Sequence, residues 1–547
     1  MPSVPTICLA IAVLVSGTIL IALGSHLVFL GDDWQIVLYR RGEDPGALLD
    51  PHVGHLIVAL VVIYKLLLAA FGMSSPIPFH VASTLLYLLA AVLLFAYAKR
   101  RVGEWLALLA ITPILFLGAS AGDQLAPFQM FFSGSIAAGL GALLALDRDD
   151  LLGDTFAFVL ISLAICFSET GLAFAVGALV RIALGSRPWA GRLWIVLVPA
   201  ALYGLWWLGW GHTGPSYLSL HNVADAPRYV LDAVAHALAA LLGLSSASNQ
   251  VPEAVGQEWV PAALLVAFGL AALRLRRLAP VPPGVWVALA IGLAFWTLAG
   301  VNATPFREPG NERYLYPGAV FVVLIAVELF AGIRLSPRGL LGLGAVVMAS
   351  VAANLVFLND AYKFFWKPLS ERSRGALTAV ELVGEGNPSY APRVAGDFLA
   401  DIDAGSYLSA VEAFGSPAYA ESELASAPEE ARAGADAVLA DALGIHLQPS
   451  TGSNGRCRRA RASEAGGVAV SLPPGEITLI ASSGGRGDLL LGHFSEELPV
   501  DLGPLPPRGV VSLVIPVDRA ARPWRLGLRG RGAFSVCGER VEGERSP

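Results

Sequence analysis

The chain has 547 residues, of which 55% are hydrophobic and only 15% are charged, and its formal net charge is −6. Soluble domains usually carry about a quarter charged residues, so this composition excludes a wholly soluble protein. No cluster of basic residues with interleaved aromatics is present, and we expect no nucleic-acid partner. The apolar excess lies in long runs before residue 359, and the remainder has the composition of an ordinary polar protein.

Long apolar runs follow one another from the N-terminus. A membrane-spanning helix needs about 20 mostly apolar residues. The runs that meet this requirement are 6–29, 79–98, 104–120, 127–146, 154–168, 171–185, 193–211, 259–275, 284–302, 315–333 and 339–358. We therefore expect a mainly α fold, a polytopic membrane bundle of about eleven transmembrane helices.

Two further apolar runs contain charged residues. The run 55–72 contains Lys65, and the run 227–245 contains Arg228, Asp232 and His236. If both crossed the membrane, the basic loops would be divided between its two sides. We expect instead that both form helices at the outer membrane interface.

If these two runs are not counted as membrane-spanning helices, the basic residues of the short loops all lie on one side of the membrane. Short loops rich in Lys and Arg are typical of the cytoplasmic side. The N-terminus is then inside, and everything after Asn359 is outside. The residues concerned are Lys99, Arg100, Arg101, Arg148, Arg187, Arg192, Arg274, Arg276, Arg277, Arg334 and Arg338. The first run lacks a preceding basic segment, so we expect an uncleaved helix rather than a signal peptide.

We expect three parts: a transmembrane domain over 1–358, an extracytoplasmic helical region over 359–447 and an extracytoplasmic β-sandwich over 448–547. The last part begins with a polar linker at 448–455 and continues with short alternating stretches at 467–472, 477–481, 489–491, 510–517 and 524–528. Pro and Gly clusters separate these stretches, as in small β-sandwiches.

The cysteines divide into two pairs. Cys8 and Cys166 lie within apolar runs and are expected to be buried hydrophobic residues. Cys457 and Cys537 bracket the C-terminal segment, and outside the cytoplasm they are expected to form a disulfide.

Polar residues of the outer loops are the candidates for chemistry. Asp32 and Asp33 follow the first apolar run, and adjacent carboxylates at a membrane surface must be solvated, paired or bound to a cation. They are candidates for a general base or for ligands of a divalent cation, unless they only end the span. His52 and His55 follow in the same loop, with a spacing that fits no standard zinc motif.

The second outer loop contains Asp123, and the third contains Glu169, in a tight turn between two apolar runs. The alternative for Glu169 is that it serves only to turn the chain. The last outer loop contains Arg307 and Arg313, with Tyr314 directly after the second arginine. A guanidinium presents a planar set of donors suited to phosphate oxygens. The alternative is that Arg307 and Arg313 pair with Glu308 and Glu312.

In this order and on one side, the motifs resemble those of the GT-C superfamily of membrane glycosyltransferases, which includes protein O-mannosyltransferases, lipid A aminoarabinose transferases and oligosaccharyltransferase catalytic subunits. The features are an acidic pair after the first span, a His/Pro/Gly segment before an interfacial helix, further acidic residues and a late Arg-Tyr-x-x-Pro. Here they are Asp32-Asp33, Pro51-His52-Val53-Gly54-His55-Leu56, Asp123 with Glu169, and Arg313-Tyr314-Leu315-Tyr316-Pro317. The resemblance covers about 1–358. The mannosyltransferase pattern has Asp-Glu and His-Pro-Pro-Leu instead, so neither sugar nor acceptor is carried over.

The resemblance implies an inverting transfer of a sugar from a polyprenyl-phosphate donor to a cell-envelope glycan, lipid or protein on the outer face. Asp33 or Asp32 would act as the base, and Arg313 would hold the phosphate. The remaining side chains would bind the substrates, namely His52, His55, Asp123, Glu169, Arg307 and Tyr314. By position alone, the β-sandwich is similar to the carbohydrate-binding modules of membrane arabinosyltransferases.

Two other functions stay open. One is a transporter or lipid flippase, which would carry ionisable residues in mid-membrane and inverted repeats. The other is a catalytically silent membrane scaffold that binds glycans. The composition, rich in Ala, Gly, Leu and Arg, favours a GC-rich bacterial source, and we therefore expect a multi-pass protein of the plasma membrane.

Overall fold

A computed structural model describes residues 2–278, 280–392, 402–450, 456–462, 470–481, 486–504, 510–516 and 522–538. The chain is mainly helical and forms two compact units. The bundle unit comprises Met1–Leu27, Tyr39–Phe71 and Pro76–Lys367, and the C-terminal unit comprises Val28–Leu38, Gly72–Ser75 and Pro368–Pro547. The boundary lies later than the predicted residue 358, and two short early segments belong to the C-terminal unit.

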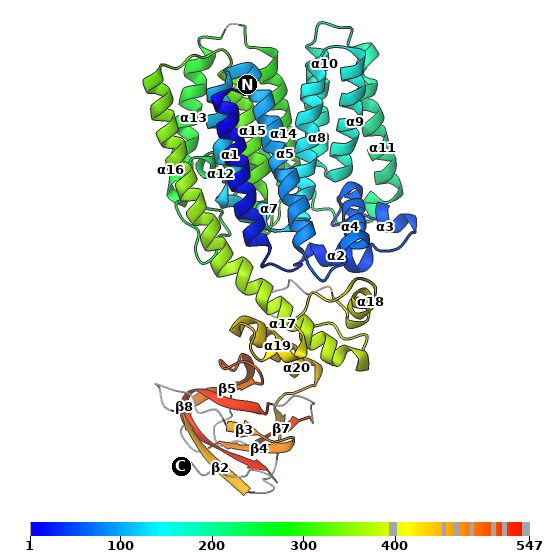
Figure 1. Cartoon of the computed structure of the whole chain (residues 1–547), viewed down its shortest axis with the longest axis vertical. Coiled ribbons are helices and arrows are strands. Elements are labelled where there is room, and N and C mark those ends of the chain that lie inside the picture. Colours follow the sequence, from blue (N-terminus) through cyan, green and yellow to red (C-terminus); the bar gives the residue numbers. More distant parts are fainter. Residues whose placement is uncertain are drawn as a thin grey trace. The chain divides into compact units, whose positions relative to one another are not determined.

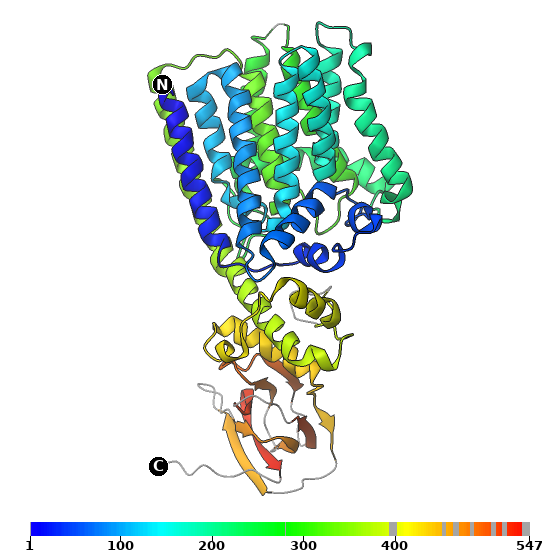
Figure 2. The same ribbon diagram turned by 45° about the vertical axis from the view of Figure 1, so that its right-hand side comes forward.

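The bundle unit consists of apolar helices that run alongside one another (Figures 1 and 2). They are α1 (Val4–Gly24), α5 (Ile77–Val102), α6 (Glu104–Leu115), α8 (Met130–Leu146), α9 (Leu151–Phe167), α10 (Thr170–Ala183), α11 (Trp194–Gly209), α12 (Leu220–Leu241), α13 (Val260–Leu275), α14 (Pro283–Val301), α15 (Glu312–Leu329) and α16 (Pro337–Ala361). Three shorter helices complete the unit, α3 (Pro45–Leu49), α4 (Val58–Phe71) and α7 (Ala121–Leu125).

Seven helical segments of the described chain are long and apolar enough to cross a membrane. They are Val4–Gly24, Ile77–Val102, Glu104–Leu125, Pro127–Leu146, Gln257–Leu275, Pro283–Val301 and Pro337–Gly386. The shorter apolar helices α4, α9, α10 and α11 have 14 to 17 residues. Each predicted run contains a helix, but the first helix ends at Gly24 rather than at residue 29. A side chain at Gly24 would collide with the ring of His80.

One end of the bundle is held together by ion pairs, and we call these residues the paired cluster: Arg101, Asp147, Asp154, Arg192 and Glu328. Asp154 is buried and bonded to Arg192, with Nη2 to Oδ1 at 2.6 Å, and also to Arg187 at 2.9 Å. Arg101 bonds to both Glu328 and Asp147, and Tyr97 also donates to Glu328. Most of the predicted basic loop residues lie in the segments that form this end.

The two ambiguous runs form α4 and α12. Helix α12 begins beside the end of α14, where the Asn222 side chain donates to the carbonyls of Val301 and Ala303 at 3.3 and 3.1 Å. The loop after α12 returns to the same segment, because the Ser248 N–H donates to the Gly310 carbonyl at 2.8 Å. Helix α12 and its return loop thus contact one segment, residues 301–310.

The C-terminal unit begins with helices, namely α2 (Asp32–Tyr39), α17 (Lys367–Val383), α18 (Ala404–Phe414), α19 (Glu421–Leu424) and α20 (Glu429–Ala442). The early segment Val28–Leu38 packs against the late helices. The Val28 N–H donates to Ser370 Oγ at 2.8 Å, and the buried Trp34 ring meets Tyr407 edge-on at 5.7 Å.

Eight strands follow: β1 (Gln448–Pro449), β2 (Arg456–Ala462), β3 (Val470–Leu472), β4 (Gly475–Ala481), β5 (Arg486–Gly492), β6 (Val500–Pro504), β7 (Val510–Ile515) and β8 (Trp524–Gly538). The first half of the long β8 pairs with β3 and β5, and its second half pairs with β2 and β4, all antiparallel. Strand β8 thus joins two groups of strands. One group contains β3, β5 and β6, and the other contains β1, β2, β4 and β7.

The predicted disulfide is confirmed, because Cys457 on β2 is bonded to Cys537 on β8. It ties the second strand of this unit to the last. Strands β1, β2 and β6 were not predicted. Residues 467–469 of the predicted stretch 467–472 and residue 517 of the stretch 510–517 lie outside the described residues. Cys8 and Cys166 are free and only partly buried, so full burial was wrong for both.

Candidate functional site

The turn between α9 and α10 carries the first element of the site. Glu169 Oε2 lies 2.9 Å from His55 Nδ1, and the Tyr203 hydroxyl on α11 donates to Glu169 Oε1 at 3.0 Å. Burial of the Glu169 carboxyl raises its pKa, but the hydrogen bond and charge of His55, the Tyr203 hydroxyl and the charge of Arg307 outweigh this effect. The pKa therefore lies below its ordinary value, and Glu169 is a carboxylate at neutral pH.

The loop that presents His55 is held by its own backbone. The N–H groups of His52 and His55 each donate to the other's carbonyl, at 3.0 and 2.9 Å, around Val53 and Gly54. Gly54 has a φ of +88°, and Val53 has a φ of +50°, which is uncommon for a β-branched residue. This tight turn fixes the separation of the two imidazoles, and the buried His52 ring packs on Phe128 at 5.0 Å.

A second element joins α7 to the start of α15. The Gly122 N–H donates to Glu312 Oε2 at 3.0 Å, and a side chain at Gly122 would lie only 2.7 Å from Glu312 Cδ. A side chain at this position would displace the end of the Glu312 side chain from this hydrogen bond. Asp123, the next residue, is 1% exposed and feels the charges of Glu312 and Arg313.

The Asp123 carboxylate lacks a hydrogen bond of normal geometry with any described residue, although the Tyr316 N–H faces it. Nearby buried oxygens share this condition in the described part of the chain, namely Gln124 Oε1, Ser133 Oγ and the Tyr316 hydroxyl, of which the last two face each other. Buried polar groups are nearly always satisfied by protein, water or ligand. This cluster therefore has spare capacity to accept hydrogen bonds from hydroxyl groups or to contact a cation.

Two arginines complete the arrangement. The Arg307 guanidinium lies over the Tyr217 ring, 4.9 Å from its centroid, and the Tyr229 hydroxyl donates to the Arg307 carbonyl at 3.2 Å. Tyr314 lies close enough to Arg307, Arg313, Asp123 and Glu169 to feel all four charges. We call His55, Asp123, Glu169, Arg307, Glu312, Arg313 and Tyr314 the acidic cluster.

The acidic cluster brings together side chains from the first outer loop, from α7, from the α9–α10 turn and from the segment before α15. His52, one turn away from His55 along the chain, adjoins it. Among the described residues, no ion pair joins Arg307 or Arg313 to Glu308 or Glu312, although the charge of Arg313 acts on Glu312. Gly122 and Glu312 were not predicted as site residues. Tyr203 was not predicted either, because a single tyrosine within an apolar helix has no distinguishing sequence pattern.

Asp32 and Asp33 belong to the C-terminal unit, where they open α2. Asp33 is 1% exposed, and its Oδ2 accepts the Leu30 N–H at 3.1 Å, while Asp32 is half-buried. Their meeting with the acidic cluster stays a prediction. Among the described residues, no group of three or more His, Cys, Asp or Glu side chains is placed to hold a metal ion.

The comparisons with known proteins add no family. Searches against protein-family models, curated proteins and solved structures find no significant match for this chain.

Proposed function

We propose that the chain is an integral-membrane inverting glycosyltransferase that moves a sugar from a polyprenyl-phosphate donor to an acceptor at the extracytoplasmic face. The observation that carries the proposal is the acidic cluster. Three carboxylates and two guanidinium groups gather at one end of an apolar bundle. A lipid-linked sugar phosphate needs this combination, because its phosphate is anionic, its sugar offers hydroxyl donors and its tail is apolar.

The arginines would bind the phosphate of the donor. Arg307 is half-buried and stacked on Tyr217, and the Arg313 side chain is exposed at the first turn of α15. When the bond between the anomeric carbon and the phosphate oxygen breaks, negative charge grows on the departing polyprenyl phosphate. Preorganised cationic donors at this position stabilise the transition state, commonly by several kcal/mol.

The unsatisfied carboxylate of Asp123 would accept hydroxyl groups of the sugar, with Gln124 and Tyr316 beside it. A site built to pair with hydroxyl groups discriminates strongly between sugars, because an unmatched buried acceptor is costly. The Glu169–His55 pair would orient the loop that closes over the donor.

The acceptor hydroxyl attacks the anomeric carbon on the face opposite the phosphate, so the configuration inverts. Its proton passes to a carboxylate, and the resemblance gives this role to Asp33 or Asp32. One base suffices, because the phosphate leaves as an anion and needs no acid.

The test is a transfer assay with the protein reconstituted in lipid and a radiolabelled polyprenyl-phosphate sugar. Asp33→Asn and Asp32→Asn are compared with Asp360→Asn, a partly exposed acidic residue of α16 outside the acidic cluster. We expect one variant of the pair to lose transfer about 100-fold or more while Asp360→Asn keeps the full rate. Full activity in both Asp33→Asn and Asp32→Asn would rule out the base assignment.

A second function is favoured by one observation. The buried carboxylate of Asp123 lies within the candidate span Glu104–Leu125, and ionisable groups inside spans often mark ion or proton pathways. A coupled transporter would lose substrate uptake into vesicles in Asp123→Asn and would show no sugar transfer with any lipid donor.

A further inference from the structure

The loop Leu329–Gly332, at the end of the bundle that carries the paired cluster, joins three helix ends. The Gly332 N–H donates to the Arg101 carbonyl at the end of α5, at 3.0 Å. Arg274, in the last turn of α13, donates through Nε to the Leu329 carbonyl at 3.0 Å and through Nη2 to the Ala331 carbonyl at 2.8 Å. The ends of α5, α13 and α15 therefore meet at one place.

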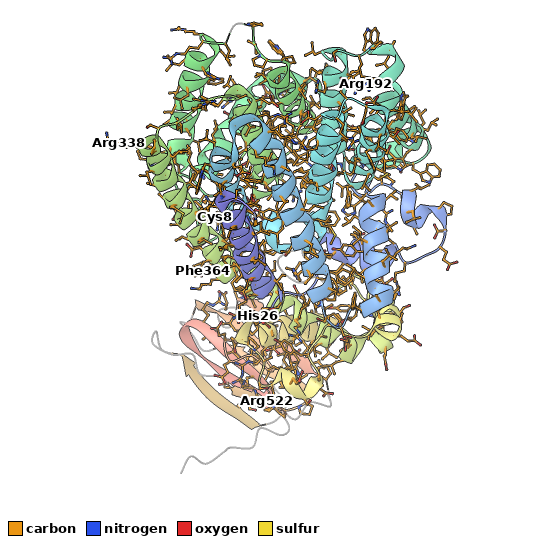
Figure 3. All side chains as sticks on the ribbon, turned by 45° about the horizontal axis from the view of Figure 1, so that its top comes forward. Cys8, His26, Arg192, Arg338, Phe364 and Arg522 are labelled. Atoms are coloured by element: carbon orange, nitrogen blue, oxygen red, sulfur yellow. A yellow bond between two sulfur atoms is a disulfide. The ribbon has the colours of Figure 1, made fainter. Side chains whose placement is uncertain are left out.

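Five exposed cations lie within a few residues of this junction, and we call them the cationic patch: Lys99, Arg276, Arg277, Arg334 and Arg338. None of them forms an ion pair with a carboxylate of the described residues. The segments 99–104, 274–278 and 329–338 contain a single carboxylate, that of Glu104. Figure 3 shows Arg338 at the start of α16, at the edge of the bundle.

This lack of partners distinguishes the patch from its neighbours at the same end. Arg101 and Arg192 are bonded to buried carboxylates, and Arg100 lies 3.6 Å from Asp147. Arg274 is bonded to backbone carbonyls. The cationic patch is thus the part of this end whose positive charge the described protein does not neutralise.

The helices that lead away from the patch expose apolar faces. Only 11% of the apolar window in the segment Gln257–Leu275, which contains α13, is buried, and Leu265 and Leu273 are 72% and 58% exposed. Leu341, in the first turns of α16, is 75% exposed, and Trp105 beside Glu104 is 47% exposed. Cations at the end of apolar faces, with an amphipathic indole at the same level, match a lipid whose headgroup is anionic.

We propose that the cationic patch binds the phosphate headgroup of an anionic phospholipid, whose acyl chains lie along the exposed faces of α13 and α16. The five cations supply charge complementarity, and the apolar faces exclude a purely soluble anion as the natural occupant. This inference rests on the membrane-spanning part of the proposed function and is independent of glycosyl transfer.

The test is native mass spectrometry of the whole protein in a neutral detergent, titrated with dioleoylphosphatidylglycerol or dioleoylphosphatidylcholine. The test variant Arg276→Gln/Arg334→Gln is matched by Arg228→Gln/Lys363→Gln, which removes two exposed cations outside the patch. Each cation near a membrane surface contributes about fivefold to the binding of an anionic lipid. We expect phosphatidylglycerol to bind more tightly than phosphatidylcholine and to bind about 25-fold more weakly to the test variant than to the wild type.

The control variant should bind like the wild type, and raised salt should weaken phosphatidylglycerol binding while leaving phosphatidylcholine unchanged. Equal affinity for the two lipids, or equal loss in the test and control variants, would overturn the proposal. Displacement of the lipid by an equal concentration of inorganic phosphate would show that the patch recognises free phosphate and not a lipid. A protein that is soluble without detergent would refute the membrane part of the proposed function instead.

Discussion

The two charged clusters of the bundle unit treat buried carboxylates in opposite ways. In the paired cluster, Asp154 is 2% exposed and receives two guanidinium groups, from Arg187 and Arg192. In the acidic cluster, Asp123 is equally buried, yet neither of its oxygens has a normal hydrogen bond with a described residue. Both carboxylates lie near helix ends of one bundle, so burial alone does not separate them. What differs is whether the protein itself supplies the partner.

This difference indicates that the paired cluster stabilises the fold, whereas the acidic cluster is available to a ligand. A buried ion pair that is complete within the protein leaves nothing for a ligand, and breaking it exposes the partner to a large desolvation cost. A buried acceptor without a partner is a cost that the folded protein bears, and such costs concentrate at functional sites. Substitutions in the two clusters should therefore separate stability from activity.

The largest effect is expected for Asp154→Ala. The substitution leaves Arg192 buried without its main partner, which should lower the free energy of unfolding by about 3–5 kcal/mol. Denaturant titration in detergent measures the loss. The control is Asp150→Asn, which breaks the exposed pair with Arg148 but keeps an oxygen for the Gly153 N–H, and no resolvable change is expected. An Asp154→Ala protein as stable as the control would show that the paired cluster does not hold this end together.

Asp123→Asn should give the opposite pattern. The change replaces a buried carboxyl group next to Glu312 and removes no hydrogen bond of normal geometry within the described protein, so the unfolding midpoint should stay within error of the wild type. Sugar transfer should fall about 100-fold, because the amide is a poorer acceptor for substrate hydroxyl groups. The matched variant is Asp154→Asn, whose unfolding midpoint should fall below that of the wild type. If Asp123→Asn unfolded as easily as Asp154→Asn, the contrast between the clusters would be wrong.

A carboxylate of the C-terminal unit provides a third case, satisfied by backbone dipoles. Asp436 on α20 accepts the N–H groups of His493, Phe494 and Ser495 at 2.8, 2.8 and 2.9 Å. Burial raises its pKa to about 6, although these three N–H groups oppose the shift. Since this value lies above that of the unfolded chain, 3.8, the group's stabilising contribution is full below pH 3.8 and is lost as the pH rises through about 6.

The expected loss for Asp436 across this window is about 3 kcal/mol. Amide hydrogen exchange at His493–Ser495, corrected for its intrinsic pH dependence, should show protection falling between pH 4 and 7 in the wild type. Asp436→Asn keeps an acceptor oxygen but cannot titrate, so its protection should be flat over the same range. A wild-type profile without slope, identical to that of Asp436→Asn, would contradict the shift.

Some residues of the site can be predicted from the sequence alone, and others cannot. His55, Asp123 and Glu169 were predicted because polar residues between long apolar runs are costly at a membrane surface, and their common side followed from the order of the runs. Glu312 entered only through the alternative of an ion pair with an arginine, because only the fold shows that its carboxylate accepts the Gly122 N–H. The placement of Asp33 in a buried turn of another unit could not be foreseen, since it depends on contacts of Val28 and Trp34 with residues more than 300 positions later.

Strand β2 shows a similar limit within the C-terminal unit. Its sequence, Arg456 to Ala462, has four arginines and no apolar alternation, so periodicity gives no sign of a strand. Its conformation follows from pairing with β8 and from the bond between Cys457 and Cys537. The paired cysteines were the only sequence signal that pointed to this segment.

The smallest effect is expected at Glu169, which stands between the two extremes because it is paired and yet belongs to the acidic cluster. Its pKa lies below the ordinary value of 4.5, so its contribution to stability is present above pH 4.5 and is lost as the pH falls through the folded-state pKa. Glu169→Gln keeps one acceptor oxygen, for either His55 or Tyr203, but loses the second acceptor and the charge, and it should lower the free energy of unfolding by about 1 kcal/mol at pH 7. Glu308→Gln, at an exposed loop residue, is the matched control and should have no effect. The difference between wild type and Glu169→Gln should shrink as the pH falls below 4.5, because protonation removes from the wild type the same charge that the substitution removes. A difference in the free energy of unfolding that persisted unchanged at pH 3 would mean that Glu169 stabilises the turn through its shape and not through its charge. Glu169 would then be a structural residue and not part of the site.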